Sequence, residues 1–359
     1  MTDSARLKKL AREYMAAHPG TRYQQALDAV RAHPTPPGTD AWLDFIAAAD
    51  TSQLTARWAH NALEPNLRAP LGWAADEHLA VGPECQFVWA DLGEARDRGH
   101  GSHAAVLGRT GSGKTELMRT WLTALAARYS PNRVQFIIAG AGAARGLQEL
   151  PHTAAVLCLK TDGPDAAATL AAVLTAELDR RMDLIAAAAA RLTAGTDIHH
   201  YRALSASGQA EPLPDLVVVV DELADYDDSD NHRHGVSLTD ALVRTTRAGR
   251  TLGVHLILTA RTFTREFRSL LENVSLRVSL GTNNRGDSEW FLNTSGLTRA
   301  SVVDAGGGAP FGAAFMATAH TAAAPMLVCA SSSARADALR ALIATAPRSG
   351  YRVADPATA

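Results

Sequence analysis

Short apolar runs alternate with longer helical stretches from about residue 80 onward. Strands that are buried on both faces of a sheet are continuously apolar, and strand–helix alternation is typical of a mainly parallel sheet flanked by helices. The sequence therefore predicts an α/β fold. The predicted strands cover residues 104–107, 134–138, 216–220, 254–259, 276–280 and 313–317, and the predicted helices begin at Gly113 or cover 164–192 and 238–247.

The N-terminal part of the chain has a different pattern. Residues 4–32 carry two amphipathic stripes separated by "AHPGTR", which predict a small helical hairpin. Residues 33–40, "HPTPPGTD", are too rich in proline and glycine for a helix or a central strand, and one more helix is predicted near 41–49. We expect a hairpin appendage over 1–35, a linker and connecting segment over 36–80, the main domain over 81–335, and a C-terminal helix and tail over 336–359.

Composition limits the classes of function. A chain of 359 residues with 47% hydrophobic content can bury one large core. A formal net charge of −2 gives no general attraction to nucleic acid or to anionic membranes. The three cysteines lie far apart, which disfavours a zinc site or a disulfide framework, and no window has the length of apolar sequence that a membrane span needs. We expect a cytoplasmic protein, either free or peripheral to a membrane complex.

A phosphate-binding motif follows the first predicted strand of the main domain. Residues 108–115, "GRTGSGKT", match G-x-x-x-x-G-K-[ST] and precede a predicted helix. The glycines let backbone N–H groups point at phosphates, and the positive end of the helix adds to that field. Lys114 is expected to reach the β- and γ-phosphates of ATP, and Thr115 to ligate Mg²⁺. The expected nucleotide contacts are Gly108, Arg109, Thr110, Gly111, Ser112, Gly113, Lys114, Thr115 and Glu116.

An acidic pair ends the most apolar predicted strand. In "LVVVVDEL", Asp221 and Glu222 follow four valines, at the strand end where open α/β sheets bind ligands. Asp221 is expected to hold Mg²⁺ through water, and Glu222 to orient and polarise the attacking water. Alone, this pair is best interpreted as solvated surface acids. Beside the phosphate-binding loop, adjacent Asp-Glu is typical of motor ATPases and disfavours a small-molecule kinase.

Several motifs in order resemble one family. The segments "SHAAVLGRTGSGKTELMRTWLTALAARYSP", "GLQELPHTAAV", "LPDLVVVVDELAD" and "RAGRTLGVHLILTAR" resemble the FtsK/SpoIIIE (FtsK–HerA) ATPases, with the greatest resemblance to EccC-type modules of type VII secretion. The resemblance covers about residues 66–330. It implies a RecA-like P-loop NTPase domain that forms a ring, often a hexamer, with ATP between neighbouring subunits. Arg250 matches an arginine that reaches the neighbour's phosphate, and Arg247 is a second candidate; a surface charge at a helix end explains either one equally well.

Two positions depart from that family pattern. Family members read A-T-Q-R after the fourth strand, with the glutamine sensing the γ-phosphate, whereas this chain reads "LTAR" and has Ala260 there. The hydroxyl of Thr259 is a partial substitute. The family's V-D-F-K-G-G is replaced by "IAGAGAARG", residues 138–146, which is small and apolar. ATP binding is therefore better supported than fast hydrolysis.

Three functions remain open from the sequence. The leading hypothesis is an ATP-binding motor or coupling module of the EccC kind that acts on protein substrates or on a secretion complex, as a homo-oligomeric ring or with a partner ATPase chain. The second is a DNA translocase, whose DNA affinity falls steeply with salt. The third is a nucleotide-stabilised scaffold with little hydrolysis. Residues 225–235 mix acids and histidines without metal-ligand spacing, so they are interpreted as a solvated loop.

Overall fold

The computed structural model describes most of the main domain. The described residues are 12, 15, 20, 22–25, 39–75, 86–94, 98–157, 165–192, 197–223, 237–264, 267–295, 297 and 312–355. The predicted N-terminal hairpin lies almost entirely outside them, and so does the acidic loop at 225–235. Within the described residues, one sheet forms the centre of the fold. Its strands are β1 (Arg68–Ala74), β2 (Phe87–Asp91), β3 (Ala104–Leu107), β4 (Val134–Ala139), β5 (Thr153–Leu157), β6 (Asp215–Val220), β7 (Val254–Ala260), β8 (Leu276–Ser279), β9 (Ala313–Ala317) and β10 (Ala324–Val328).

The strand order determines which loops meet. The order is β2-β1-β10-β9-β8-β3-β7-β6-β4-β5. The strands from β8 to β5 run parallel to one another, whereas β9, β10, β1 and β2 pair antiparallel. Strand β7 therefore lies between β3, which leads into the phosphate-binding loop, and β6, which leads into the acidic pair. The residues that follow β7 are placed between these two motifs.

The structure has a strand at each of the six predicted positions, which confirms the prediction. Their apolar side chains are buried in the sheet, and this burial explains why these segments form strands. Every residue of β4, β6 and β7 is buried. Four strands were missed, namely β1, β2, β5 and β10. In β1, "RAPLGWA", Pro70 and Gly72 hide the strand pattern, and the pairing with β2 shifts register between them. Gly72 is required there, since a Cβ would lie 2.1 Å from the carbonyl oxygen of Leu327 on β10.

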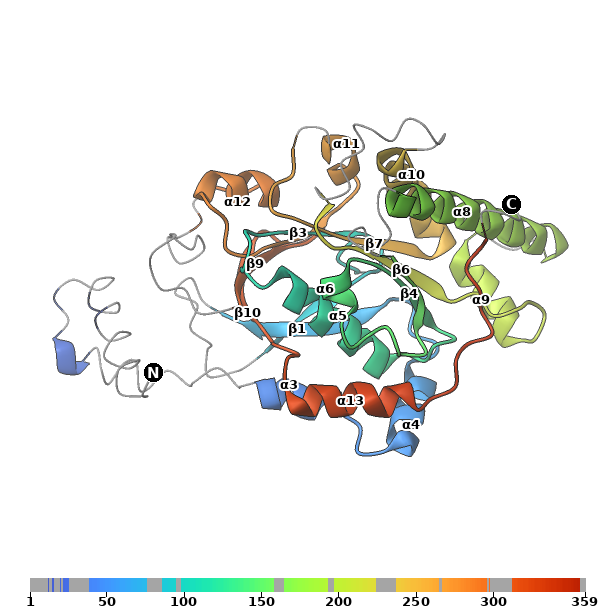
Figure 1. Cartoon of the computed structure of the whole chain (residues 1–359), viewed down its shortest axis with the longest axis horizontal. Coiled ribbons are helices and arrows are strands. Elements are labelled where there is room, and N and C mark those ends of the chain that lie inside the picture. The colour runs from blue at the N-terminus through green and yellow to red at the C-terminus, as the bar shows by residue number, and fades with distance from the viewer. Residues whose placement is uncertain are drawn as a thin grey trace.

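Helices cover both faces of the sheet (Figure 1). Helix α5 packs on one face and is itself covered by α3, α4 and α13, whereas α10 packs on the other face beneath α8. Because it has neighbours on almost every side, α5 is buried around most of its circumference. The helices are α3 (Thr39–Ile46), α4 (Thr51–Asn61), α5 (Lys114–Arg128), α6 (Ala141–Ala144), α8 (Asp165–Leu192), α9 (Ile198–Ala206), α10 (Leu238–Leu252), α11 (Arg268–Leu271), α12 (Arg285–Leu292) and α13 (Ala334–Ala344).

The described part of residues 36–80 packs against the main domain. One buried tryptophan makes the attachment, because Trp58 of α4 donates its indole N–H to the Ala126 carbonyl of α5 at 3.0 Å; within the segment, the buried Trp42 of α3 donates to the Pro70 carbonyl of β1 at 2.8 Å. Strand β1 extends the sheet itself. This segment was expected as linker and connection. In the structure its residues 39–75 add two helices and a strand to the main fold.

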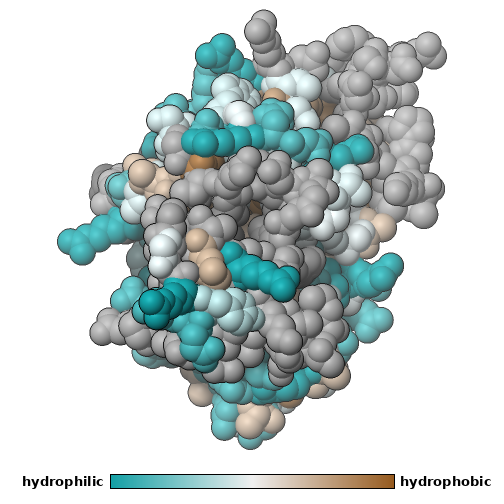
Figure 2. Space-filling view, turned by 90° about the vertical axis from the view of Figure 1, so that its left-hand side faces the viewer, coloured by the Kyte–Doolittle hydropathy of each residue, from teal (hydrophilic) through white to brown (hydrophobic). Residues whose placement is uncertain are grey.

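The described surface is mainly hydrophilic on the face that lies at the left of Figure 1. Seen directly, that face shows hydrophilic residues with only small, separate hydrophobic areas among the coloured residues (Figure 2). Among the described residues, no helix has the length and apolar character that crossing a membrane requires.

Candidate nucleotide-binding site

The loop after β3 has the backbone that a phosphate cradle needs. Gly111 and Gly113 have φ values of +76° and +101°, which favour glycine. The loop is anchored to neighbouring strand ends, because the Gly108 N–H donates to the Ala260 carbonyl at 3.1 Å and the Arg109 N–H donates to the Gly281 carbonyl at 2.8 Å. Gly113 caps α5 without a side-chain hydrogen bond. The first N–H groups of α5 are thus left for an anion.

Lys114 lies inside the loop and makes three contacts there. Its side chain is 8% exposed. The ammonium donates to the carbonyls of Gly108 at 2.6 Å and Arg109 at 3.4 Å, and it pairs with Glu222 Oε2 at 3.3 Å. The structure therefore joins the lysine of the first motif to the glutamate of the second. A phosphate that takes this lysine must compete with that ion pair.

Asp221 meets two hydroxyl groups from other elements. Thr115 Oγ1 donates to Asp221 Oδ2 at 3.2 Å, and Thr259 Oγ1 donates to Asp221 Oδ1 at 3.0 Å. Burial raises the pKa of the Asp221 carboxyl, and these two hydrogen bonds together with the charge of Lys114 lower it only in part. A bound cation would favour its ionised form. The predicted proximity of Thr115 and Asp221 is present.

The residues present fit a phosphate group and Mg²⁺. The buried Ser112 hydroxyl in the loop has no hydrogen-bond partner among the described residues. A buried hydroxyl of this kind is expected to have a partner, and a phosphate oxygen would supply one. The hydroxyl of Thr115 and the carboxylate of Asp221 are oxygen donors of the type that Mg²⁺ prefers.

Glu222 has an unusual backbone and two charged partners. Its φ is +64°, in the left-handed region that is rare for residues other than glycine. Its N–H donates to Thr259 Oγ1 at 2.9 Å. Its Oε1 accepts from the Arg261 N–H at 3.0 Å and pairs with Arg261 Nε at 3.2 Å. Sequence reasoning missed Arg261, although it directly follows Ala260, where the sensing glutamine is absent.

The small loop at 138–146 lies against the candidate metal ligands. Gly140 has a φ of +138°, and a Cβ there would lie 2.6 Å from Cβ of Asp221. A Cβ on Gly142 would lie 3.1 Å from Cγ2 of Thr115. Because the backbone approaches so closely, a side chain at Gly140 would force Asp221 or the loop to shift, whereas one at Gly142 would require Thr115 to move by only a few tenths of an ångström. In this chain, the glycines of the loop therefore allow its backbone to lie directly against Asp221 and Thr115.

The side chain of Glu116 turns away from the expected nucleotide role. Its Oε1 accepts from the Ser331 N–H at 2.5 Å, and its Oε2 accepts from the Ser332 hydroxyl at 2.6 Å and from Arg119 at 3.3 Å. These contacts attach the start of α5 to the segment before α13. Sequence reasoning did not anticipate this contact, since Ser331 and Ser332 are more than 200 positions away. The backbone N–H of Glu116 belongs to the first turn of α5.

The two candidate arginines lie at the opposite edge of the sheet. Arg247 and Arg250 are on the last turns of α10, which leads through Gly253 into the start of β7. The phosphate-binding loop follows the end of β3, which runs parallel to β7. Both side chains are exposed, and Arg250 Nε pairs with Glu94 Oε1 at 3.7 Å. The structure does not bring either arginine to the nucleotide site of its own chain.

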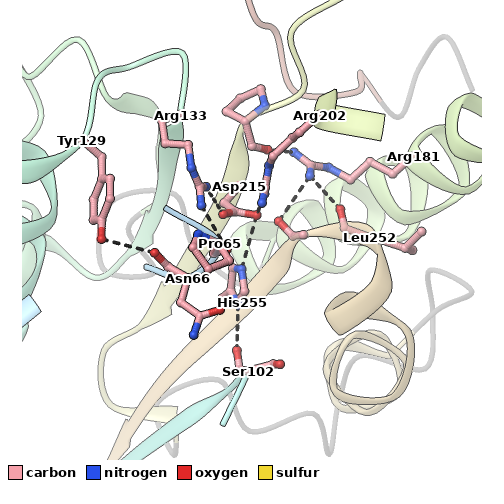
Figure 3. Close-up of polar contacts among 12 residues, drawn as sticks. Pro65, Asn66, Ser102, Tyr129, Arg133, Arg181, Arg202, Asp215, Leu252 and His255 are labelled. Carbon is pink, nitrogen blue, oxygen red and sulfur yellow. Dashed lines mark hydrogen bonds and ion pairs between the residues drawn. The ribbon is translucent and has the colours of Figure 1, made fainter. Parts of the chain in front are cut away.

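A buried charge cluster fixes the amino edge beside Arg250. Asp215 of β6 is bound by Arg133 and Arg202, and His255 Nε2 lies 3.4 Å from its Oδ1 (Figure 3). Burial alone would raise the pKa of the Asp215 carboxyl, but Arg202, Arg133 and His255 outweigh it and hold the pKa well below its usual range. Arg181 of α8 reaches the same edge. These contacts join β6 to β7, α8 and α9.

Sequence comparison relates the chain to the FtsK/SpoIIIE family and to proteins of type VII and ESX secretion systems. The FtsK/SpoIIIE family model matches residues 79–265. The chain is 30% identical over 268 residues to the ESX-1 secretion system protein EccCa1 of Mycobacterium tuberculosis, which covers 70% of this chain and 34% of EccCa1. It is 28% identical over 269 residues to the type VII secretion system protein EssC of Staphylococcus aureus, with 72% and 16% covered. The chain thus spans about a third or less of the length of these relatives.

Comparison of structures confirms the predicted P-loop α/β fold. The cytoplasmic domain of the type VII secretion ATPase EccC from Thermomonospora curvata matches with a TM-score of 0.73 and 22% identity, over 90% of this chain and 36% of that one. The conjugation coupling protein TcpA of pCW3, solved with ATPγS, matches with a TM-score of 0.52 and 17% identity, over 74% and 67%.

Proposed function

Because the chain belongs to the FtsK/SpoIIIE family, we propose that it is an ATP-binding motor or coupling module of the EccC kind. One observation carries the proposal. The phosphate-binding loop, Thr115, Asp221 and Glu222 converge at the carboxyl edge of the parallel strands, with Lys114 paired to Glu222 at 3.3 Å. Loop, metal ligands and water-orienting carboxylate are the set that phosphoryl transfer to water requires.

Each residue has one task in this proposal. The loop N–H groups and the start of α5 bind the phosphates of ATP, and Lys114 turns from Glu222 to the β- and γ-phosphates. The hydroxyl of Thr115 and the carboxylate of Asp221, directly or through water, hold Mg²⁺. The metal supplies charge neutralisation at the phosphates. Glu222 then orients and polarises the attacking water.

The position of the arginines supports a ring. Arg250 is exposed at the edge opposite the nucleotide, so in a head-to-tail arrangement it faces the neighbour's site. There its guanidinium, or that of Arg247, would stabilise the charge of the transition state. The neighbour is a second copy in a homo-oligomer such as a hexamer, or a partner ATPase module, since the relatives extend well beyond the part that this chain matches.

The substrate proposed is a protein or a secretion complex rather than DNA. The relatives are named as secretion system proteins, and the net charge of −2 gives no general attraction to phosphate backbones. The solved relative from T. curvata is a cytoplasmic domain, so we place this module on the cytoplasmic side of such a complex.

The test measures ATP binding and hydrolysis on the purified chain at several protein concentrations, with Lys114→Ala and Glu222→Gln as variants. The motor proposal expects Mg²⁺-dependent turnover that rises with concentration and is lost in both variants. Lys114→Ala also loses binding, whereas Glu222→Gln retains it. Stimulation by DNA that weakens with salt would favour a translocase instead. Tight binding without turnover at every concentration would favour a nucleotide-stabilised scaffold.

A further inference from the structure

The carboxylate of Glu222 is held from two sides by different groups. Oε2 pairs with Lys114 at 3.3 Å. Oε1 accepts from the Arg261 N–H at 3.0 Å and lies 3.2 Å from Arg261 Nε. The two oxygens of one side chain therefore have separate partners, one inside the phosphate-binding loop and one beyond the end of β7.

These partners respond differently to a nucleotide. Lys114 is 8% exposed and already contacts the loop carbonyls, so binding phosphates requires it to leave Glu222. Arg261 is 51% exposed and lies outside the loop, and nothing in phosphate binding requires it to move. When Lys114 turns to the phosphates, Oε2 becomes available to a water molecule while Oε1 stays attached to Arg261.

The left-handed backbone conformation of Glu222 is held by Thr259, at the end of β7. A non-glycine residue at a φ of +64° costs roughly 1–2 kcal/mol and persists where its surroundings hold it. Thr259 accepts the Glu222 N–H at 2.9 Å. Thr259 and Arg261, on either side of Ala260, both contact Glu222, and Ala260 has no polar atom on its side chain. The backbone is held by one neighbour and the carboxylate by the other.

We propose that Arg261 is a positioning residue for the hydrolytic reaction. It holds Oε1 of Glu222, so that Oε2 faces the attacking water after Lys114 has turned to the phosphates. The inference rests on the proposed function, because it assumes that the site binds ATP. It gives this chain a fixed group at the position next to the missing glutamine.

The experiment compares Arg261→Ala and Arg261→Lys with a control, Arg244→Ala, on the full chain. Arg244 of α10 is 38% exposed and also pairs with a carboxylate, that of Asp179 on α8. Four quantities are measured: the affinity for a fluorescent ADP analogue, the affinity for the same analogue with aluminium fluoride, which mimics the transition state, and kcat and KM for ATP. Melting temperatures verify that each variant is folded.

For Arg261→Ala we expect the affinity for the ADP analogue and the KM for ATP to stay within about twofold of the original chain. We expect kcat, and the affinity for the analogue with aluminium fluoride, to fall about tenfold, since only the transition state requires the oriented carboxylate. The loss is limited because the backbone N–H at 261 remains. Arg261→Lys recovers part of it, and Arg244→Ala matches the original chain.

Two results would overturn the inference. An unchanged affinity of Arg261→Ala for the ADP analogue with aluminium fluoride would mean that the ion pair does not position Glu222. This measurement tests the inference even if turnover is undetectable. A higher kcat would mean that Arg261 restrains Glu222 instead. Failure of the original chain to bind the ADP analogue is a separate outcome, which refutes the proposed function and this inference with it.

Discussion

Replacing Thr259 by valine removes one hydroxyl from the centre of the site at nearly constant side-chain size. That hydroxyl donates to Asp221 Oδ1 at 3.0 Å and accepts from the Glu222 N–H at 2.9 Å. Thr259 is 0% exposed, and the two hydrogen bonds that it makes are partly buried. The substitution thus leaves a partly buried N–H and a partly buried carboxylate oxygen each with one contact fewer.

The expected cost follows from these two bonds. The bond to the backbone N–H contributes about 0.5–1.5 kcal/mol and the bond to the carboxylate about 1.5–3 kcal/mol, so together they contribute roughly 2–4 kcal/mol to the free energy of unfolding. Unfolding entropy is about 2 cal/mol/K per residue, or about 0.75 kcal/mol/K for 359 residues. The melting temperature of Thr259→Val should therefore fall by about 3–5 °C.

Thr259→Ser is the matched control, since it retains the hydroxyl and loses one methyl group worth about 1 kcal/mol. Thermal unfolding without nucleotide compares the two variants. In addition, Thr259→Val should need severalfold more Mg²⁺ for half-maximal ATP binding, because Asp221 is no longer fixed toward Thr115. Equal melting temperatures and equal Mg²⁺ dependence for the serine and valine variants would refute the role given to the hydroxyl.

Three further predictions concern other contacts. Gly140→Ala should weaken Mg²⁺-dependent nucleotide binding, because Gly140 has a φ of +138° and the added Cβ would lie 2.6 Å from Cβ of Asp221. The control is Gly208→Ala, at a φ of +75° where the added Cβ meets open space. It should cost only about 1–2 kcal/mol of unfolding free energy from backbone strain. Arg181→Met should lower the free energy of unfolding by about 3–5 kcal/mol, because it removes a fully buried partner of the buried Glu177 carboxylate. Arg180 pairs with the same carboxylate but is 34% exposed, so Arg180→Met should lower it by less than about 1 kcal/mol. Urea titrations measure the free energy of unfolding of both arginine variants. Burial lowers the pKa of His152 from 6.5 to about 4. Because only the unfolded state takes up that proton, stability is complete above pH 6.5 and falls by about 2 kcal/mol by pH 5, a loss that should be absent from His152→Gln.

The sequence predicted the contiguous parts of the site. The loop at 108–115 and the pair Asp221 and Glu222 are each encoded within a few residues, next to apolar strands that are unmistakable. Their proximity follows from a parallel sheet, in which all carboxyl ends meet at one edge. The nucleotide contacts themselves, and the roles of Arg247 and Arg250, stay predictions.

The parts that were missed depend on packing between distant segments. Glu116 contacts Ser331 and Ser332, and this pairing has no signature in local sequence. The requirement for Gly140 arises from the neighbouring strand that carries Asp221. Strand β1 was hidden because proline and glycine are tolerated at its bulge, in the antiparallel part of the sheet.

The two departures from the family pattern have different physical consequences. The backbone of the loop at 138–146 lies close to Thr115 and Asp221, and glycine at Gly140 and Gly142 accommodates this approach. Ala260 removes a polar side chain, yet the strand order places β7 between the two motifs, so its neighbours Thr259 and Arg261 still reach Asp221 and Glu222. Under the proposed function, hydrolysis depends on how firmly those two residues hold the acidic pair once Lys114 has turned to the phosphates. Of the two residues, Arg261 is the one whose substitution is expected to lower turnover while nucleotide binding is retained, which substitution of Lys114 cannot do.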